Sequence, residues 1–132
     1  MADTVSLLTT SVHSGGTQTL QGEKAKGDAY FGQSDGLHTV MIELNEFIGT
    51  VKIQGSLETT PGDNDWFDLE LGLDGFSVDT TGKVASLSTK SLPYTSAETS
   101  QKAYNSRGNF VWIRADISNW TAGTISRIEL NR

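Results

Sequence analysis

The sequence predicts an all-β domain, an antiparallel β-sandwich or jelly roll of about eight strands. From His38 onward, apolar and polar residues alternate through most segments, which is the side-chain period of a β-strand. Turn-forming residues separate these segments at short, regular spacing. The composition, with 14 glycines and 2 prolines, suits a chain with many turns.

Length and charge restrict the classes of function. A chain of 132 residues predicts one domain. Its net charge of −6 argues against a nucleic-acid partner, which requires a basic surface. There is no cysteine, so disulfides and thiolate metal sites are excluded, as is usual for a protein made in a reducing cytoplasm. No signal peptide or apolar membrane span is recognisable, so we expect no membrane partner.

The first part of the chain, residues 1–36, is weakly patterned. Short strands are predicted at Thr4–Leu8, Thr17–Leu20 and Asp28–Phe31. We expect this segment to form edge strands, or else an N-terminal arm that binds a partner. The sandwich domain itself is predicted over residues 37–132.

The middle of the chain shows the clearest alternation, in strands beginning at His38, Thr50 and Trp66. A turn is predicted at Asn45–Gly49, between the first two of them. The residues expected to face the core are Val40, Ile42, Leu44, Val51, Ile53, Leu57, Phe67, Leu69 and Leu71. Further strands are expected at 76–78 and 83–92. The polar stretch from 93 to 109 reads as one long loop, or as a loop with a short helix over 96–104.

The last part, Phe110–Leu130, predicts a hairpin with a long loop over 118–123. Val111, Ile113, Ala115 and Ile117 share one face of its first strand. Phe110, Trp112 and Arg114 share the other, so a second layer or a partner must cover that face.

Candidate catalytic and metal-binding groups are sparse. The two histidines, His13 and His38, lie in no recognisable motif. Asp68 and Glu70 would lie on one strand face at a spacing that glycosidases use, but outward carboxylates are usually only solvated. The Asp63–Asp65 run lacks the glycine of a calcium loop and reads as a turn. We therefore expect no enzyme activity, no cofactor and no metal.

The aromatic residues carry more information. Trp66, Trp112 and Trp120 are expected either to pack within the sandwich or to anchor a protein or a sugar. Trp112 beside Arg114 is the first choice for a binding patch, and Trp120, in its predicted loop, is the second.

Two resemblances arise at these residues. Phe110, Val111, Ile113, Arg114 and the final Ile128-Glu-Leu130 resemble the closing strands of galactose-binding-like jelly rolls, without their paired cysteines. More broadly, Gly49–Leu57, Asp65–Phe67 and Gly108–Arg114 are similar to small β-sandwich structural proteins of tailed bacteriophages.

The second resemblance implies a virion component made in the host cytoplasm. Such proteins bind capsid or other virion proteins and are commonly symmetric oligomers, often trimers. The function expected is a capsid decoration (cement) protein, with a neck, tail or fibre component and a carbohydrate-binding module as alternatives. The residues expected to bind the partner are Leu7, Leu8, Trp66, Trp112, Arg114 and Trp120.

Overall fold

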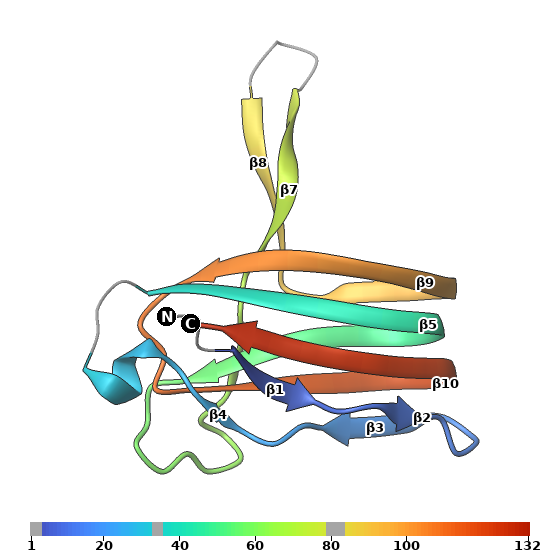
Figure 1. The fold of residues 1–132 in the computed structure, drawn as a ribbon, viewed down its shortest axis with the longest axis horizontal. Helices are drawn as coiled ribbons and strands as arrows, with labels where there is room; N and C mark the ends of the chain where they lie inside the picture. The colour runs from blue at the N-terminus through green and yellow to red at the C-terminus, as the bar shows by residue number, and fades with distance from the viewer. Residues whose placement is uncertain (1–3, 33–35, 79–83) are drawn as a thin grey trace.

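The computed structural model describes residues 4–32, 36–78 and 84–132, and it confirms the all-β prediction (Figure 1). Ten strands form one antiparallel sheet, and the one helical element in these ranges is the 3₁₀ helix η1. The elements are β1 (Thr4–Leu8), β2 (Ser11–Val12), β3 (Gln18–Gln21), β4 (Ala25–Lys26), η1 (Asp28–Phe31), β5 (Leu37–Ser56), β6 (Phe67–Asp68), β7 (Leu71–Val78), β8 (Val84–Thr89), β9 (Leu92–Arg107) and β10 (Trp112–Asn131). Along the sheet the main order is β1-β10-β5-β9-β7-β8.

Three long strands, β5, β9 and β10, bend together and give the sandwich its two layers. The register between β5 and β10 shifts around Asn45–Ile48, and the register between β5 and β9 shifts around the same residues. Figure 1 shows the strands turning back at one end of the molecule, which we call the folded end. At the opposite, open end, β5 and β10 both begin and finish. One sheet folded over on itself therefore supplies both layers.

Residues with positive φ mark the bend in both central strands. Glu46 in β5 and Asn119 in β10 each have φ of 52°, and Gly123 has φ of 85°. Trp120 and Phe47 pack between the layers here, with ring centroids 6.0 Å apart. The Trp120 indole nitrogen donates to the Ala122 carbonyl at 3.0 Å, which satisfies its polar edge inside the core.

The hairpin predicted for Phe110–Leu130 is wrong in its pairing. The two arms of β10 do not pair with each other, since residues 112–118 pair with 50–56 of β5 and residues 124–131 with 39–45. The turn-forming residues at 118–123 bend a continuous strand, and those at Asn45–Gly49 do the same in β5. A bend in a strand needs the same residue types as a hairpin loop, so the local sequence does not distinguish a bent strand from a hairpin.

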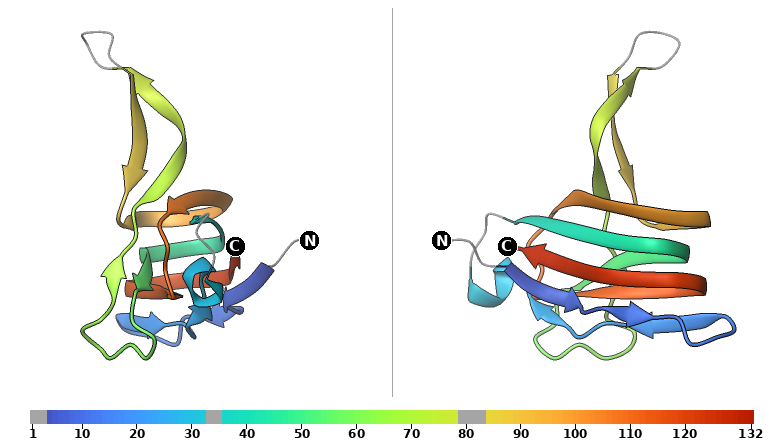
Figure 2. Two further views of the ribbon diagram at one scale, coloured as in Figure 1. Left: turned by 90° about the vertical axis from the view of Figure 1, so that its left-hand side faces the viewer. Right: turned by 45° about the vertical axis from the view of Figure 1, so that its right-hand side comes forward.

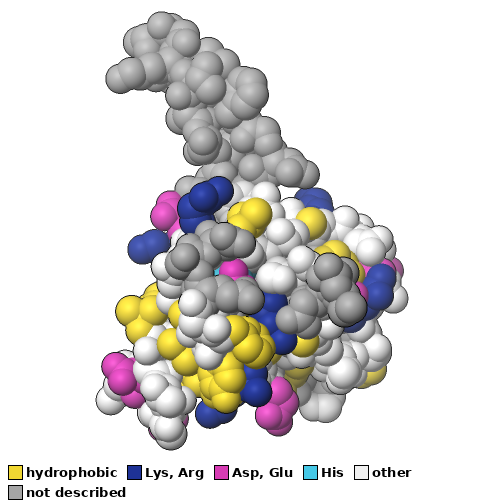
Figure 3. All heavy atoms as spheres, turned by 60° about the vertical axis from the view of Figure 1, so that its left-hand side comes forward, with side chains coloured by type: hydrophobic (Ala, Val, Ile, Leu, Met, Phe, Trp, Pro, Cys, Tyr) yellow, Lys and Arg dark blue, Asp and Glu magenta, His cyan; other side chains and the backbone are white. Residues whose placement is uncertain are grey.

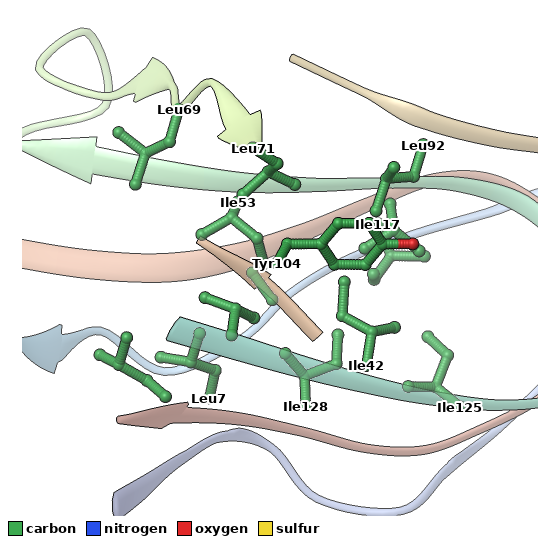
Figure 4. Packing of buried hydrophobic residues seen from close by; sticks show 14 of the residues in the cluster. Leu7, Ile42, Ile53, Leu69, Leu71, Leu92, Tyr104, Ile117, Ile125 and Ile128 are labelled. Carbon is green, nitrogen blue, oxygen red and sulfur yellow. The ribbon is translucent and has the colours of Figure 1, made fainter. Parts of the chain in front are cut away.

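The core lies between the two layers, and Figure 4 shows its side chains converging from β5, β9 and β10. Of the residues predicted to face inward, seven are buried: Val40, Ile42, Leu44, Val51, Ile53, Leu69 and Leu71. Leu57 and Phe67 are instead 62% and 41% exposed. Phe67 belongs to the two-residue strand β6, which is too short to impose the predicted alternation.

Two further expectations are wrong. Residues 28–31 form η1 rather than a strand, and residues 96–104 belong to β9 rather than to a loop or helix. Of the strand expected over 83–92, residues 84–89 form β8, while residue 83 lies outside the described ranges.

Different strands cover the two edges of the folded sheet. On one side β1, β2, β3 and β4 all pair with β10, and Leu7 of β1 is only 1% exposed in the core. On the other side β7 meets β9 at a single register pair, Gly72 with Asn105, and continues into a hairpin with β8. All views in Figures 1 and 2 show this hairpin standing clear of the sandwich.

Candidate functional site

An aromatic patch at the open end is the strongest candidate for a binding surface. It consists of Tyr30 and Phe31 of η1 and Trp112 at the start of β10. The Tyr30 ring lies 5.1 Å from that of Trp112 and 5.5 Å from that of Phe31. Tyr30 and Phe31 are 42% and 48% exposed, although rings of this size are normally covered. Figure 3 shows hydrophobic side chains gathered on this face, with Lys and Arg side chains beside them.

Glycines on both sides of η1 hold the two rings in place. A side chain at Gly27 would collide with the Phe110 carbonyl, so only glycine lets the chain approach β10 this closely. The amides of Gly27 and Ala29 then donate to the carbonyls of Val111 and Phe110 at 2.9 and 3.1 Å. Gly32 ends the helix with φ of 72°, in the left-handed conformation typical of a helix C-terminus.

Cationic side chains lie over the faces of the patch. Lys24 Nζ is 4.6 Å from the Trp112 ring centroid, and Lys26 Nζ is 4.5 Å from that of Tyr30. The Arg132 guanidinium is 5.1 Å from the Phe31 ring centroid. These contacts stabilise the rings by cation–π attraction and give a locally basic surface on a chain of net charge −6. The arrangement suits an apolar or acidic protein surface.

Trp66 and Arg114 form a second feature at this end. The Arg114 guanidinium stacks 4.2 Å from the Trp66 ring centroid, and its Nε donates to Gln54 Oε1 at 2.9 Å. Beside Trp66 lies a shallow groove of about 270 Å³, lined also by Leu57, Glu58, Asn64, Asp65 and Phe67. Asp65 accepts the Gly62 amide at 2.7 Å, so the 63–65 run forms a capped turn.

The residues predicted to bind a partner divide into two groups. Trp66, Trp112 and Arg114 are half-buried at the open end, as is Leu8 along the edge formed by β1. Leu7 and Trp120 are each 1% exposed, so their side chains belong to the core. Trp120 lies in the bend rather than in a loop. Phe110, expected to face outward, is 8% exposed and packs against His38 and Phe67.

The sequence does not identify Tyr30 and Phe31 as surface residues, because its pattern predicts a short strand over residues 28–31. The available signal was the pair of glycines, Gly27 and Gly32, that bracket four residues with two adjacent aromatics. Alternation in a strand would place one of two adjacent rings inside, whereas a single helical turn fixed by glycines exposes both.

His38, buried between β5 and η1, has a structural role. The Asp28 amide donates to His38 Nε2 at 3.2 Å, which assigns the ring proton of the neutral form to Nδ1. Burial lowers the pKa of His38 below its usual 6.5, although the Asp28 charge acts in the opposite direction. Ser106 lies opposite His38 in the ladder and is also buried. However, the Nε2 lone pair is already occupied, so His38 is not available as a base for a serine nucleophile.

The carboxylates considered for glycoside hydrolysis do not share a strand. β6 ends at Asp68, so Glu70 lies outside it. Asp68 is engaged by Lys52 at 3.6 Å and by Gln54 at 3.1 Å. Within the described ranges, no three His, Asp or Glu side chains converge as a metal site. The described helix is also far too short and polar to cross a membrane.

Comparison with known proteins identifies no relative of this chain. No family model, no curated protein and no solved structure matches the chain.

Proposed function

We propose that this chain is a non-enzymatic structural protein of a bacteriophage virion, a decoration protein on the capsid or otherwise a component of the neck or tail. The aromatic patch is the observation that carries the proposal. Exposed apolar residues are common singly, but rings gathered in one place and rimmed by charge mark an interaction surface. The resemblance to phage sandwich proteins, carried by Gly49–Leu57, Asp65–Phe67 and Gly108–Arg114, supplies the class of partner.

The partner would be a capsid or other virion protein, with this chain as an oligomer, often a trimer in proteins of the kind it resembles. Tyr30, Phe31 and Trp112 would insert into an apolar recess of the partner. Lys24 and Lys26 would meet acidic residues around its rim, because charge complementarity selects the partner. Trp66 and Arg114 extend the same surface.

Deleting the N-terminal residues would not test this surface cleanly. β1 and β3 belong to the sheet and Leu7 to the core, so removing residues 1–20 would unfold the edge of the domain. A better test is Phe31→Ser, which removes an exposed ring. Val12→Ser is the matched control, since Val12 is 68% exposed on the β2 edge, near the folded end.

The assay is co-sedimentation of purified chain with virions made from the parent genome after deletion of this gene. Quantitative mass spectrometry then gives the number of copies bound. We expect saturable binding of the unmodified chain, roughly tenfold weaker binding of Phe31→Ser, and no change for Val12→Ser. Absence of saturable binding, or equal binding of Phe31→Ser and the unmodified chain, would refute the proposal.

A carbohydrate-binding module is the second candidate, supported by the groove beside Trp66. It combines an aromatic ring with the amide of Asn64 and nearby carboxylates, the groups that recognise sugar hydroxyls. Binding of the unmodified chain on a glycan array, lost in Trp66→Ala, would favour this function. A blank array would exclude it for the sugars tested.

A further inference from the structure

The straight arm of β9, residues 98–104, is an open sheet edge. On one side these residues pair with β5, in continuous register from Leu44↔Ser100 to Leu37↔Arg107. On the other side, within the described ranges, β9 pairs only at Asn105. The backbone N–H and C=O groups facing that way are therefore without a strand partner.

This edge has few of the features that protect edges from pairing. Residues 98–104 contain no proline or glycine, and their register with β5 shifts between Glu98 and Ser100 but stays regular over residues 100–104. The two charges in the arm, Glu98 and Lys102, lie 3.5 Å apart and partly neutralise each other. Thr99, Gln101 and Ala103 are exposed and uncharged. Natural edges usually carry bulges, proline or unpaired lysine against such contacts.

The β7–β8 hairpin presents a second open edge. β8 is the last strand in the sheet order and, in the part of the chain that the structure describes, pairs only with β7. A two-stranded hairpin without further packing is marginally stable in water. β8 spans six residues, one fewer than the seven of the open β9 arm.

We propose that β8 of one copy of this chain adds to the open β9 edge of a second copy and extends its sheet. Main-chain hydrogen bonds would supply the contact, as in other cases of strand addition. The hairpin stands away from its own sandwich, so β8 cannot meet β9 of the same chain. The contact joins two different surfaces of the chain, so it builds a two-fold dimer if the two copies exchange β8 reciprocally, and a closed ring or a filament if they do not. This inference rests on the proposed function only in assuming that the chain works as an assembly.

The natural absence of cysteine allows a direct test, because disulfides can form only between introduced positions. Proteins carrying Ala85→Cys, Ser86→Cys or Ser88→Cys in β8 are each mixed with a differently tagged Gln101→Cys protein and oxidised. We expect a mixed disulfide dimer for at least one pair. Thr19→Cys, in β3 on the other side of the sheet, is the control partner and should give none.

A second variant tests the edge without cross-linking. The double substitution Gln101→Lys and Ala103→Lys places charge along the β9 edge, and its mass is measured by light scattering at the concentration where the unmodified chain assembles. We expect the mass to fall to the 14.2 kDa of one chain. Thr17→Lys with Thr19→Lys is the matched control, and its mass should equal that of the unmodified chain.

The outcomes separate this inference from the proposed function. Assembly that survives the β9 lysines, with no mixed disulfide, overturns the strand addition and leaves a virion role standing. A chain that is monomeric at every concentration also overturns it, while virion co-sedimentation decides the proposed function independently. Mixed disulfides together with loss of assembly support the pairing of β8 with β9.

Discussion

Substitution of Gly123 by alanine tests whether the fold depends on the bend of β5 and β10. Gly123 has φ of 85°, where alanine is strained by about 1–2 kcal/mol. A methyl group there would also collide with the Glu46 carbonyl and lie 2.6 Å from Phe47 Cα. Both atoms are main chain, so no side-chain rotation relieves the overlap. The two strands must separate, which adds about 1–3 kcal/mol by analogy with overpacked cores.

Gly16→Ala is the matched control. Gly16 has φ of 67°, but a methyl group there meets nothing within 4 Å, so only the backbone strain remains. Urea unfolding is followed by tryptophan fluorescence, to which Trp120 in the bend contributes together with Trp66 and Trp112. With a slope of about 2 kcal/mol per M, Gly123→Ala should unfold at a urea concentration about 0.5–1.5 M below that of Gly16→Ala. Equal midpoints for the two variants would refute the steric reasoning.

Three further predictions use the same unfolding assay. Because burial lowers the pKa of His38, the unfolded chain binds more protons below pH 6.5, so the free energy of unfolding should fall as pH drops through that value. His38→Gln should lack that part of the pH dependence, and an unchanged slope would contradict the assignment. Phe47→Ala, at a fully buried position, should cost about 3–5 kcal/mol, and a loss below 1 kcal/mol would mean that the bend is loosely packed. Arg127→Ala should cost less than about 1 kcal/mol, because its two glutamate partners are partly exposed; a larger loss would show a stronger ion-pair network.

The core faces of the strands could be predicted from sequence because burial imposes a period of two. Val40, Ile42 and Leu44, like Ile113 and Ile117, lie inside as their alternation indicates. Each of these assignments depends only on residues within one strand, which is the range over which a sequence pattern is informative.

The pairing of the strands could not be predicted in the same way. The run at 118–123 contains the residues that a hairpin loop requires, but its flanking arms pair with β5, at least 56 residues earlier in the chain. The aromatic patch is not predictable from sequence for a similar reason. The patch depends on the close approach of Gly27 to the Phe110 carbonyl. These two residues are far apart in the sequence, so no local periodicity predicts their contact.

The central position of β10 has a consequence for biosynthesis. β1, β2, β3, β4 and β5 all pair with this one strand, which is made of residues 112–131. During translation these residues leave the ribosome after every strand that pairs with them, so the N-terminal strands remain without their hydrogen-bonding partner until β10 has been made. The N-terminal strands therefore complete their pairing only after β10 has been synthesised. Ribosome-bound chains that end before residue 112 should be cut readily by protease within their first 26 residues.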